Sequence, residues 1–519
     1  MTRIGIDVGG TNTDAVVLAG QQVLAATKVA TSEDVTSGIL ASLQAVLGQP
    51  GIDVTDVEAV MIGTTHFINA VIQRLHLSKT ACLRVGLPAS ASLPPFTDWP
   101  AELAQVVDGG SYMVEGGHEY DGRPIMPLDE AAIRGAARRL RDEGIESLAI
   151  SAIFSPLDPT FEEQAADIVR AEYPDVHITC SHTLGRIGLL ERENAAILNA
   201  ALIRLAGLTI ESFAGALRTS GIAAPLYITQ NDGTVMQAER AVRQPILSFA
   251  SGATNSMRGA AALSGLQDAL VVDVGGTTTD IGALRHGFPR EANAAVKVGG
   301  VRTLFRMPDL LSIGLGGGSL VREPAGEPGS VGPQSVGYRL TREARIFGGA
   351  QLTTSDVAVA AGLLQLGDAT RVADLAPALL DGALREIRRL LAESVDSMKA
   401  TAAATPLLAV GGGAFLVPAD LPGISEVIRV EHGGVANAVG AAIAQISGET
   451  DQVFQGMSRE EALAEAERIA VSRAVAAGAA PESITTVDVE DTPLAYLPGD
   501  ARRVRTRVVG DLSHIVAAG

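Results

Sequence analysis

The sequence of 519 residues has little cysteine, few aromatic residues and fewer basic than acidic side chains. Its two cysteines, Cys82 and Cys180, are too few for a disulfide framework or for a four-cysteine zinc or iron–sulfur site within one chain. Aromatic residues make up only 3%, so we expect a core of aliphatic side chains. The net charge of −19 argues against nonspecific nucleic-acid binding, which needs Lys and Arg to displace counterions.

From the sequence we also expect neither a leader segment nor an apolar run long enough to span a membrane. Arg3 is followed at once by an expected strand that contains Asp7, where a signal peptide would have its apolar stretch. No apolar run reaches the roughly 20 residues of a membrane span. We therefore expect a cytoplasmic protein without membrane contact, large enough for two to four domains.

What the sequence does contain is a duplicated motif. Residues 7–14 (DVGGTNTD) recur as residues 273–280 (DVGGTTTD), with seven of the eight residues shared. Each copy lies between two apolar runs, a pattern that predicts two strands joined by a tight turn.

The chemistry of such a turn favours an anion. Adjacent glycines allow positive φ and close approach of the backbone to a ligand, and successive N–H groups bind negative charge. An ordinary glycine hairpin explains one copy, whereas two facing copies favour a split nucleotide site. Its predicted binding residues are Gly9, Gly10, Thr11, Asn12, Gly275, Gly276, Thr277 and Thr278, with Mg²⁺ held near Asp7 and Asp273.

The paired motif resembles the two phosphate loops of the actin, sugar-kinase and chaperone ATPase superfamily. Three longer strings narrow the resemblance to the hydantoinase A and 5-oxoprolinase family: Gly63-Thr64-Thr65 with Asn69, residues 191–194 (EREN) and residues 313–319 (IGLGGGS). The likeness runs from residue 1 to about 447. It implies an α/β fold of duplicated ribonuclease-H-like (actin-like ATPase) lobes around a central nucleotide cleft that holds ATP and Mg²⁺.

The resemblance also implies roles for residues outside the two hairpins. It places Gly411, Gly412 and Gly413 in the adenosine loop, at the end of a strand over residues 407–410, and candidate substrate contacts at Gly316, Gly317, Gly318, Ser319 and Glu191. An interlobe ion pair is the alternative for Glu191. The candidate catalytic residues are Asp7, Asp14, Asp273, Asp280, Thr65 and His66.

Some of these residues have simpler explanations. Asp14 and Asp280 either orient an attacking group or only hold their own hairpins together. His66, near the start of a helix expected over residues 67–75, is either catalytic or a capping or core histidine.

A second divalent-metal site is a further candidate. His118 and Asp121 have ligand chemistry and close spacing, and either His66 or Asp34 would complete a set. A polar β-turn around residues 121–122 is the commoner explanation of such a string.

The remaining pattern divides the chain into an N-terminal lobe (residues 1–190), an ATPase lobe (191–447) and a tail (448–519) of one helix and short strands. A long helix over residues 194–217 is expected to connect the lobes, and a strand is expected over residues 246–249. Residues 251–256 (SGATNS) depart from the family pattern by placing Thr254 and Asn255 where relatives have apolar side chains.

The resemblance implies an ATP-dependent hydrolase subunit that activates a lactam or cyclic imide, of the hydantoin or 5-oxoproline type, by phosphorylation. Hydrolysis is then expected to need a second subunit in a homo- or hetero-oligomer. Three alternatives stay open: a small-molecule kinase, a ketone-carboxylase-type ATPase subunit, and an ATP-gated activator or assembly protein.

Overall fold

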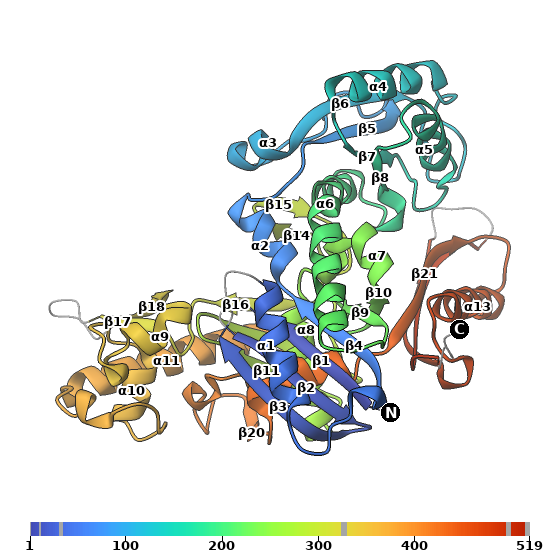
Figure 1. The fold of residues 1–519 in the computed structure, drawn as a ribbon. Helices are drawn as coiled ribbons and strands as arrows, with labels where there is room; N and C mark the ends of the chain where they lie inside the picture. The colour runs from blue at the N-terminus through green and yellow to red at the C-terminus, as the bar shows by residue number, and fades with distance from the viewer. Residues whose placement is uncertain (1, 10–11, 31–34, 323–329, 495–499, 514–519) are drawn as a thin grey trace.

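The structure, a computed structural model, describes residues 2–9, 12–30, 35–322, 330–494 and 500–513. Three larger sheets organise these residues, and helices lie between and around them (Figure 1).

The first sheet carries the first hairpin. Its strand order is β22-β23-β21-β10-β9-β4-β1-β2-β3. Strand β1 pairs antiparallel with β2 and parallel with β4. The strands are β1 (Thr2–Val8), β2 (Asn12–Ala19), β3 (Gln22–Ala30), β4 (Val57–Thr64), β9 (Leu226–Thr229), β10 (Val235–Gln237), β21 (Ile446–Phe454), β22 (Thr485–Pro493) and β23 (Arg502–Gly510).

The second sheet repeats this plan around the second hairpin. Its order is β13-β12-β11-β19-β20, with β16 pairing with β12. Strand β11 is antiparallel to β12 and parallel to β19, as β1 is to β2 and β4. The predicted duplicated α/β lobes are therefore confirmed. The strands are β11 (Ala269–Val274), β12 (Thr279–Arg285), β13 (Phe288–Pro289), β16 (Leu310–Ile313), β19 (Thr405–Val410) and β20 (Ile424–Arg429).

Two helices rich in small residues, α8 (Ser251–Ser264) and α12 (Ala436–Ala442), join the lobes. Helix α8 contacts β4 and β11, and α12 contacts β1 and β2. A Cβ added at Gly259 would lie 1.9 Å from Ala436 O, and one at Gly440 would lie 1.8 Å from Asn255 O. Only glycine permits this backbone approach.

The strand expected over residues 246–249 is wrong. Residues Pro245–Ser248 form a 3-10 helix with proline at its first turn, and the Ser248 hydroxyl donates to Pro245 O at 2.8 Å. A short apolar run does not distinguish a strand from a buried helical turn by periodicity alone.

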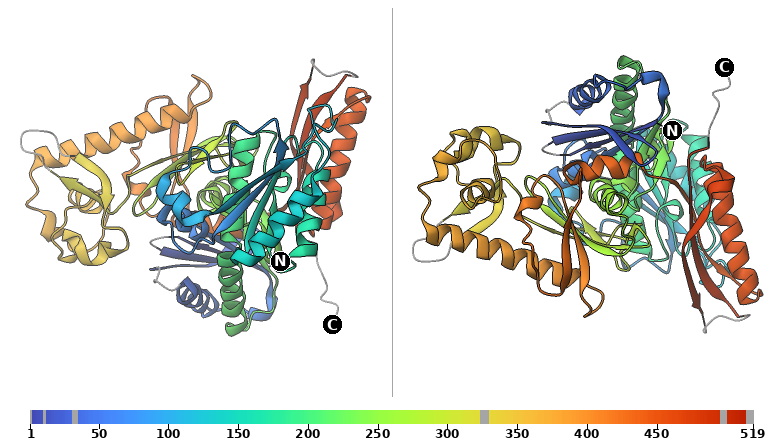
Figure 2. Two further views of the ribbon diagram at one scale, coloured as in Figure 1. Left: turned by 90° about the horizontal axis from the view of Figure 1, so that it is seen from above. Right: turned by 90° about the horizontal axis from the view of Figure 1, so that it is seen from below.

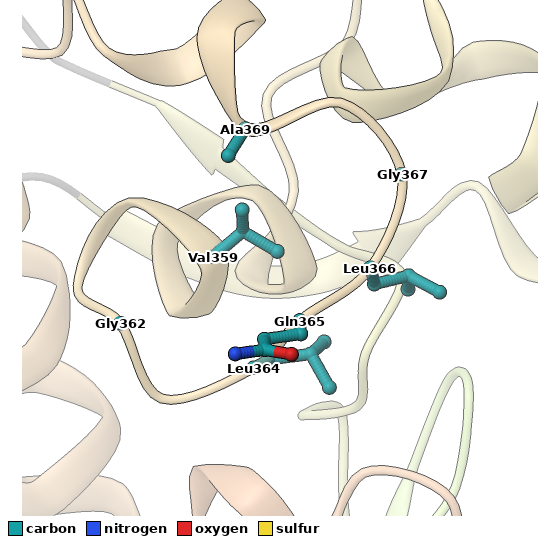
Figure 3. A pocket seen from close by; sticks show the side chains of 7 residues that line it. All are labelled: Val359, Gly362, Leu364, Gln365, Leu366, Gly367 and Ala369. Atoms are coloured by element: carbon teal, nitrogen blue, oxygen red, sulfur yellow. The ribbon is translucent and has the colours of Figure 1, made fainter.

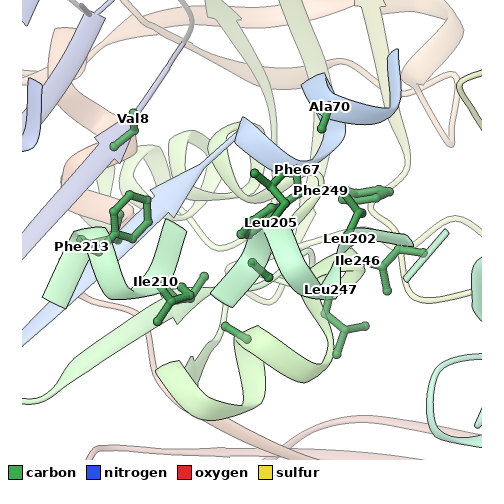
Figure 4. Close-up of a cluster of buried hydrophobic side chains, with 14 of the residues drawn as sticks. Val8, Phe67, Ala70, Leu202, Leu205, Ile210, Phe213, Ile246, Leu247 and Phe249 are labelled. Atoms are coloured by element: carbon green, nitrogen blue, oxygen red, sulfur yellow. The ribbon is translucent and has the colours of Figure 1, made fainter. Parts of the chain in front are cut away.

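The long helix is α6 (Leu189–Thr219), and its packing differs from expectation. It lies against α1, α7, β7 and β8, whereas α8 and α12 bridge the two sheets. Figure 4 shows its Leu202, Leu205 and Phe213 within the largest core cluster.

Helix α6 also corrects the expectation that no apolar segment reaches the length of a membrane span. By length and composition it is long and apolar enough to cross a membrane, with a mean hydropathy of 1.4 in its most apolar window. That window is 61% buried inside the protein, as in the core helix of a globular domain, so the composition is weak support for a membrane span.

The third sheet, in the order β6-β5-β7-β8, is parallel throughout and is covered by helices in the α/β alternation that the sequence predicts. Its elements are β5 (Thr80–Leu87), α3 (Ala101–Val107), β6 (Asp108–Glu115), α4 (Glu130–Glu143), β7 (Ser147–Ala152), α5 (Thr160–Glu172) and β8 (His177–Cys180).

The other elements complete the lobes. Figure 2 shows α11 extending on the opposite side of the molecule from α13. Their bounds are α1 (Val35–Leu47), α2 (His66–Gln73), α7 (Ala238–Arg243), β14 (Val296–Val298), β15 (Val301–Thr303), β17 (Ser319–Arg322), β18 (Ser330–Ser335), α9 (Leu340–Glu343), α10 (Thr354–Ala360), α11 (Pro377–Met398) and α13 (Arg459–Ala476).

The C-terminal region is less separate than expected. Its helix and two of its strands form as predicted, but β21 was missed, and β21–β23 extend the first sheet beyond β10. A third short strand, expected over residues 494–497, is not seen at Leu494, and residues 495–497 lie outside the described residues. The domain boundaries at residues 190 and 447 stay a prediction.

Candidate functional site

The duplicated motif folds the same way twice. Asp7 pairs with Asp14 across the first hairpin, and Asp273 pairs with Asp280 across the second. In each turn the first glycine N–H donates to a carbonyl three residues on, at 3.0 Å in the first hairpin and 2.9 Å in the second. The predicted strand–turn–strand units are therefore confirmed, although Gly10 and Thr11 lie outside the described residues.

Helix α8 brings the two hairpins to one place. The Asn255 Nδ2 donates to Asp7 Oδ1 at 3.4 Å, and the hydroxyl of the next residue, Ser256, lies close enough to the Asp273 carboxylate to lower the pKa of that group. Because consecutive residues of one helix reach the leading aspartates of both hairpins, these aspartates line a common site.

The carboxylates at this site are electrostatically strained. Burial, with repulsion from Asp14, raises the pKa of Asp7 to about 6. Burial, with repulsion from Asp280 and Asp7, raises the pKa of Asp273 to about 7 against the Ser256 hydrogen bond. Burial also raises the pKa of Asp280. A divalent cation would relieve this strain, so the donor set at Asp7 and Asp273 fits Mg²⁺.

Two polar residues at the site were missed from the sequence. Lys28 Nζ lies 2.6 Å from Asp14 Oδ1, and Asn437 Nδ2 on α12 donates to Asp7 Oδ2 at 3.0 Å and to Asp14 Oδ2 at 2.8 Å. Lys28 lies opposite Asp14 in the β2–β3 register, a position available from the sequence once that register is known. For Asn437 the only signal was a polar residue among alanines and glycines.

In the first lobe the Gly-Thr-Thr string lies beside the leading aspartate. Gly63 pairs with Asp7 across parallel strands, and a Cβ at Gly63 would lie 2.5 Å from Asp7 Oδ1. The Ser251 hydroxyl contacts both the N and the O of Thr64 at 3.2 Å, and Thr65 N donates to Val8 O at 3.4 Å. Thr65 therefore lies at the predicted cleft.

In the second lobe the glycine triplet takes the equivalent position. Val410 pairs with Asp273 across parallel strands, and a Cβ at Gly411 would lie 2.2 Å from Asp273 Oδ1. Gly413 N donates to Val274 O at 2.8 Å, while Gly412 is exposed. The triplet lies against the second hairpin, where an adenosine loop is expected, and its contact with a nucleotide stays a prediction.

The glycine run before β17 forms backbone hydrogen bonds with the second hairpin. Gly317 N donates to Gly275 O at 3.0 Å, and Gly318 N donates to Gly276 O at 2.7 Å. The buried Ser319 hydroxyl accepts from Gly316 N at 2.8 Å. These contacts fix the hairpin, in which Thr277 is half-buried and Thr278 exposed; substrate contact by the run stays a prediction.

Glu191 and His66 occupy positions with protein partners. Glu191 Oε1 lies 3.2 Å from Arg302 Nη2, so an ion pair is present at this residue. His66 is the first residue of α2; its N–H donates to Thr64 Oγ1 at 3.1 Å, and burial lowers the pKa of its ring. Substrate contact by Glu191 and a catalytic role for His66 stay predictions.

The second candidate metal set is not brought together. His118 stacks on Phe161 with its Nε2 3.6 Å from Asp158, while Asp121 accepts from Arg123 in a polar turn. His66 lies in α2, and Asp34 lies outside the described residues.

Another group with metal-ligand chemistry, Glu162, Cys180 and His182, is held by hydrogen bonds. The Glu162 carboxylate accepts from Ala152 N, from the hydroxyls of Ser155 and Ser181, and from His182. Its acceptor positions are occupied by the protein, so this is a structural carboxylate.

A cavity of about 450 Å³ beyond α10 lies apart from the hairpins (Figure 3). Apolar side chains and glycines line it, with Gln365 as its polar lining side chain among the described residues. It offers no charge or nucleophile for chemistry.

Comparison with known proteins places this architecture. The model of the hydantoinase/oxoprolinase N-terminal region matches residues 3–173, and the hydantoinase/oxoprolinase model matches residues 192–368. The chain is 28% identical over 432 residues to caprolactamase subunit alpha of Pseudomonas jessenii, covering 76% of this chain and 58% of that protein. It is 25% identical over 395 residues to the acetophenone carboxylase gamma subunit of Aromatoleum aromaticum, covering 70% of this chain and 53% of that protein.

The chain thus spans little more than half the length of these two relatives. The crystal structure of the ATP-dependent caprolactamase from P. jessenii has a similar fold, with a TM-score of 0.75 at 20% identity over 98% of this chain and 88% of that chain. The nucleotide-free structure of acetone carboxylase is also similar, with a TM-score of 0.69 at 18% identity over 99% of this chain and 88% of that chain. On the two matching models, which together match more than half of its residues, this chain belongs to the hydantoinase/oxoprolinase family.

Proposed function

We propose that the chain is the ATP-binding subunit of an enzyme that activates a lactam or cyclic imide by phosphorylation. One observation carries the proposal: consecutive residues of α8 reach the leading aspartates of both glycine hairpins, since Asn255 donates to Asp7 and Ser256 lies close enough to Asp273 to lower its pKa. Two anion-binding turns that share one site suit a polyphosphate with its metal ion.

Different residues of the site would bind the metal ion, the phosphates and the rest of the nucleotide. Asp7 and Asp273 would hold Mg²⁺, the turns that follow them would bind phosphates, and Gly411 leaves space beside Asp273 that a side chain would fill. Lys28 adds a positive charge close to Asp14, which offsets part of the acidic character of the site.

A phosphorylation step explains why such a subunit is needed. A lactam carbonyl is a poor electrophile because of amide resonance. Transfer of the γ-phosphoryl group of ATP to the carbonyl oxygen would release ADP and give an imidate phosphate, whose carbon water attacks. The tetrahedral product would expel the ring nitrogen as the amine, which opens the ring and leaves an acyl phosphate that a second water hydrolyses to carboxylate and phosphate. This chain would bind and orient the reactants, since phosphoryl transfer depends mainly on positioning and on charge stabilisation. We assign the hydrolytic half to a partner subunit, because the relatives are themselves named as subunits.

A second candidate is an ATPase subunit of a ketone carboxylase. The similarity to the acetophenone carboxylase gamma subunit supports this candidate, since the sequence identity to that subunit (25%) is close to the identity to caprolactamase subunit alpha (28%). Both reactions begin by phosphorylating an oxygen, so the nucleotide site does not separate them.

The test is ATP turnover by the purified chain, alone and with its co-expressed partner. Hydantoin, 5-oxoproline and caprolactam are supplied in separate reactions, and acetophenone with bicarbonate in another. Lactam-dependent phosphate release supports the proposal, and release only with ketone and bicarbonate supports the second candidate. A stable phosphorylated product would indicate a kinase, and nucleotide binding without turnover stimulated by any of these substrates, even with the partner present, would indicate an ATP-gated activator; either result refutes the proposed function.

A further inference from the structure

A larger cavity, of about 760 Å³, lies apart from the leading aspartates. One wall is formed by the turn over residues 230–232, β10 and α7, and the facing wall by β21 and α13. Residues 182–187, just before α6, close a third side. In Figure 1 this is the region between α7 and β10 on one side and β21 and α13 on the other.

The lining of this cavity has the opposite charge to the rest of the chain. Among the described residues its arginines outnumber its carboxylates by six to three, in a protein whose net charge is −19. The charged lining residues are Arg186, Arg240, Arg243, Arg306, Arg473 and Arg503, with Asp232, Glu449 and Asp451.

The three carboxylates are already paired. Arg306 forms ion pairs with Asp232 and Glu449, and Arg503 forms one with Asp451. Although burial opposes ionisation, Arg306 and a neighbouring arginine lower the pKa of Asp232 to about 2. Asp232 is therefore fully ionised at neutral pH, and its charge is neutralised within the protein.

Three arginines keep an unbalanced charge. In the part of the chain that the structure describes, Arg240, Arg243 and Arg473 have no carboxylate oxygen within 4.0 Å, and all three are exposed to the cavity. Arg240 donates to Gln244 Oε1 at 2.9 Å, and Arg473 donates to the Glu449 carbonyl at 2.6 Å; both acceptors are neutral. Enclosure by the cavity walls and the neighbouring guanidiniums of Arg306 and Arg243 lower the pKa of Arg240 against the opposing charge of Asp232, as expected where positive charges crowd together.

We propose that this cavity binds a small, non-aromatic anion that carries two or more carboxylate or phosphoryl groups. Guanidinium groups match both kinds of group because they donate two parallel hydrogen bonds to a pair of oxygens. Three such donors without an acidic partner suit more than one negative group. The described lining residues include no Phe, Tyr or Trp, and the ring of His182 is held by the Glu162 carboxylate, so the cavity lacks the large aromatic side chains that favour a nucleobase. The site is thus distinct in chemistry from a nucleotide site and does not depend on the proposed function.

The test uses isothermal titration of the full chain in metal-free, low-salt buffer, with citrate as the polycarboxylate and inorganic pyrophosphate as the phosphoryl compound. Saturable binding of at least one of them is expected, with one site per chain and an affinity that falls as NaCl is added. The arm that binds more tightly identifies the chemistry of the natural ligand.

The variants R240Q and R473Q are each expected to weaken binding about tenfold or more, because each removes a charged donor. The matched control is R388Q, which removes the same charge from an exposed arginine of α11 that pairs with Asp420. If R240Q does not fold, as judged by its thermal unfolding without anion, the exposed R243Q replaces it. Absence of saturable binding to both anions, or an equal loss in R388Q, would overturn the proposal.

Discussion

Replacing Asp273 by asparagine is expected to stabilise the chain, and to do so more at pH 8 than at pH 5. The reason is that burial, with repulsion from Asp280 and Asp7, raises the pKa of this carboxyl from 3.8 to about 7. The ionised form is therefore less favourable in the folded chain than in the unfolded chain. Stability from this group is fully present below the unfolded pKa and is lost as the pH rises through the folded pKa.

The size of the effect follows from the two pKa values. A difference of about 3 units corresponds to about 4 kcal/mol of destabilisation at pH 8, at about 1.4 kcal/mol per unit. At pH 5 the folded carboxyl is mostly protonated, and only ionisation in the unfolded chain contributes, about 1.5 kcal/mol. The free energy of unfolding of D273N relative to the parent chain should therefore be about 2.5 kcal/mol more favourable at pH 8 than at pH 5.

The assay is urea unfolding followed by circular dichroism at both pH values without divalent cations. The control is D420N, because Asp420 is exposed and its hydrogen bonds to Arg388 lower its pKa, so its removal gives no gain at pH 8. Equal stabilisation of D273N at the two pH values would refute the reasoning, as would the same pH dependence in D420N. The stabilised variant should also lose Mg–ATP binding, as expected where a site is organised for function at the cost of stability.

Two glycine replacements test the geometry of the site. G411A is expected to destabilise the chain by more than about 3 kcal/mol, because the new Cβ would lie 2.2 Å from Asp273 Oδ1. The control is G122A: Gly122 has nearly the same φ (83° against 86° for Gly411) but lies in open space, so this change should cost only about 1 kcal/mol. Equal losses of stability in thermal unfolding would show that strain in φ alone accounts for the effect. G440A is expected to separate α8 from α12 and to destabilise the folded chain by about 4 kcal/mol or more. The control is G207A in α6, where a new Cβ would meet nothing within 4 Å, and this change should stabilise the chain by about 0.5–1 kcal/mol. A G440A chain as stable as its parent would contradict the close packing of α8 and α12.

The hairpins were predictable because the forces that shape them are local. Alternating apolar residues define the strands, and the two glycines between them permit the turn, so the register that sets Asp7 against Asp14 follows from a few consecutive residues. The long amphipathic helices, such as α4 and α11, were predictable for the same reason.

The errors lie where distant parts of the chain determine the outcome. Residues 446–454 (ISGETDQVF) are too polar to indicate a strand alone, and they form β21 because β23, some fifty residues further on, pairs with them. The apolar run at 246–249 is helical because Pro245 fixes its first turn and because α8 begins directly after it. Local propensity is a weak guide where long-range contacts supply most of the free energy.

By itself, the sequence determined the family, the duplicated lobes and the aspartates that lead each hairpin, because these depend on motifs of consecutive residues. Only the tertiary structure decided which other polar groups meet them: Asn255 and Asn437 reach Asp7 from 248 and 430 residues away. The arginines of the large cavity likewise come from α7, α13, β23 and two connecting segments that are far apart in the sequence. These contacts depend on how the helices pack between the sheets, where close backbone contacts at Gly259 and Gly440 set the distance between α8 and α12. No local pattern records that distance.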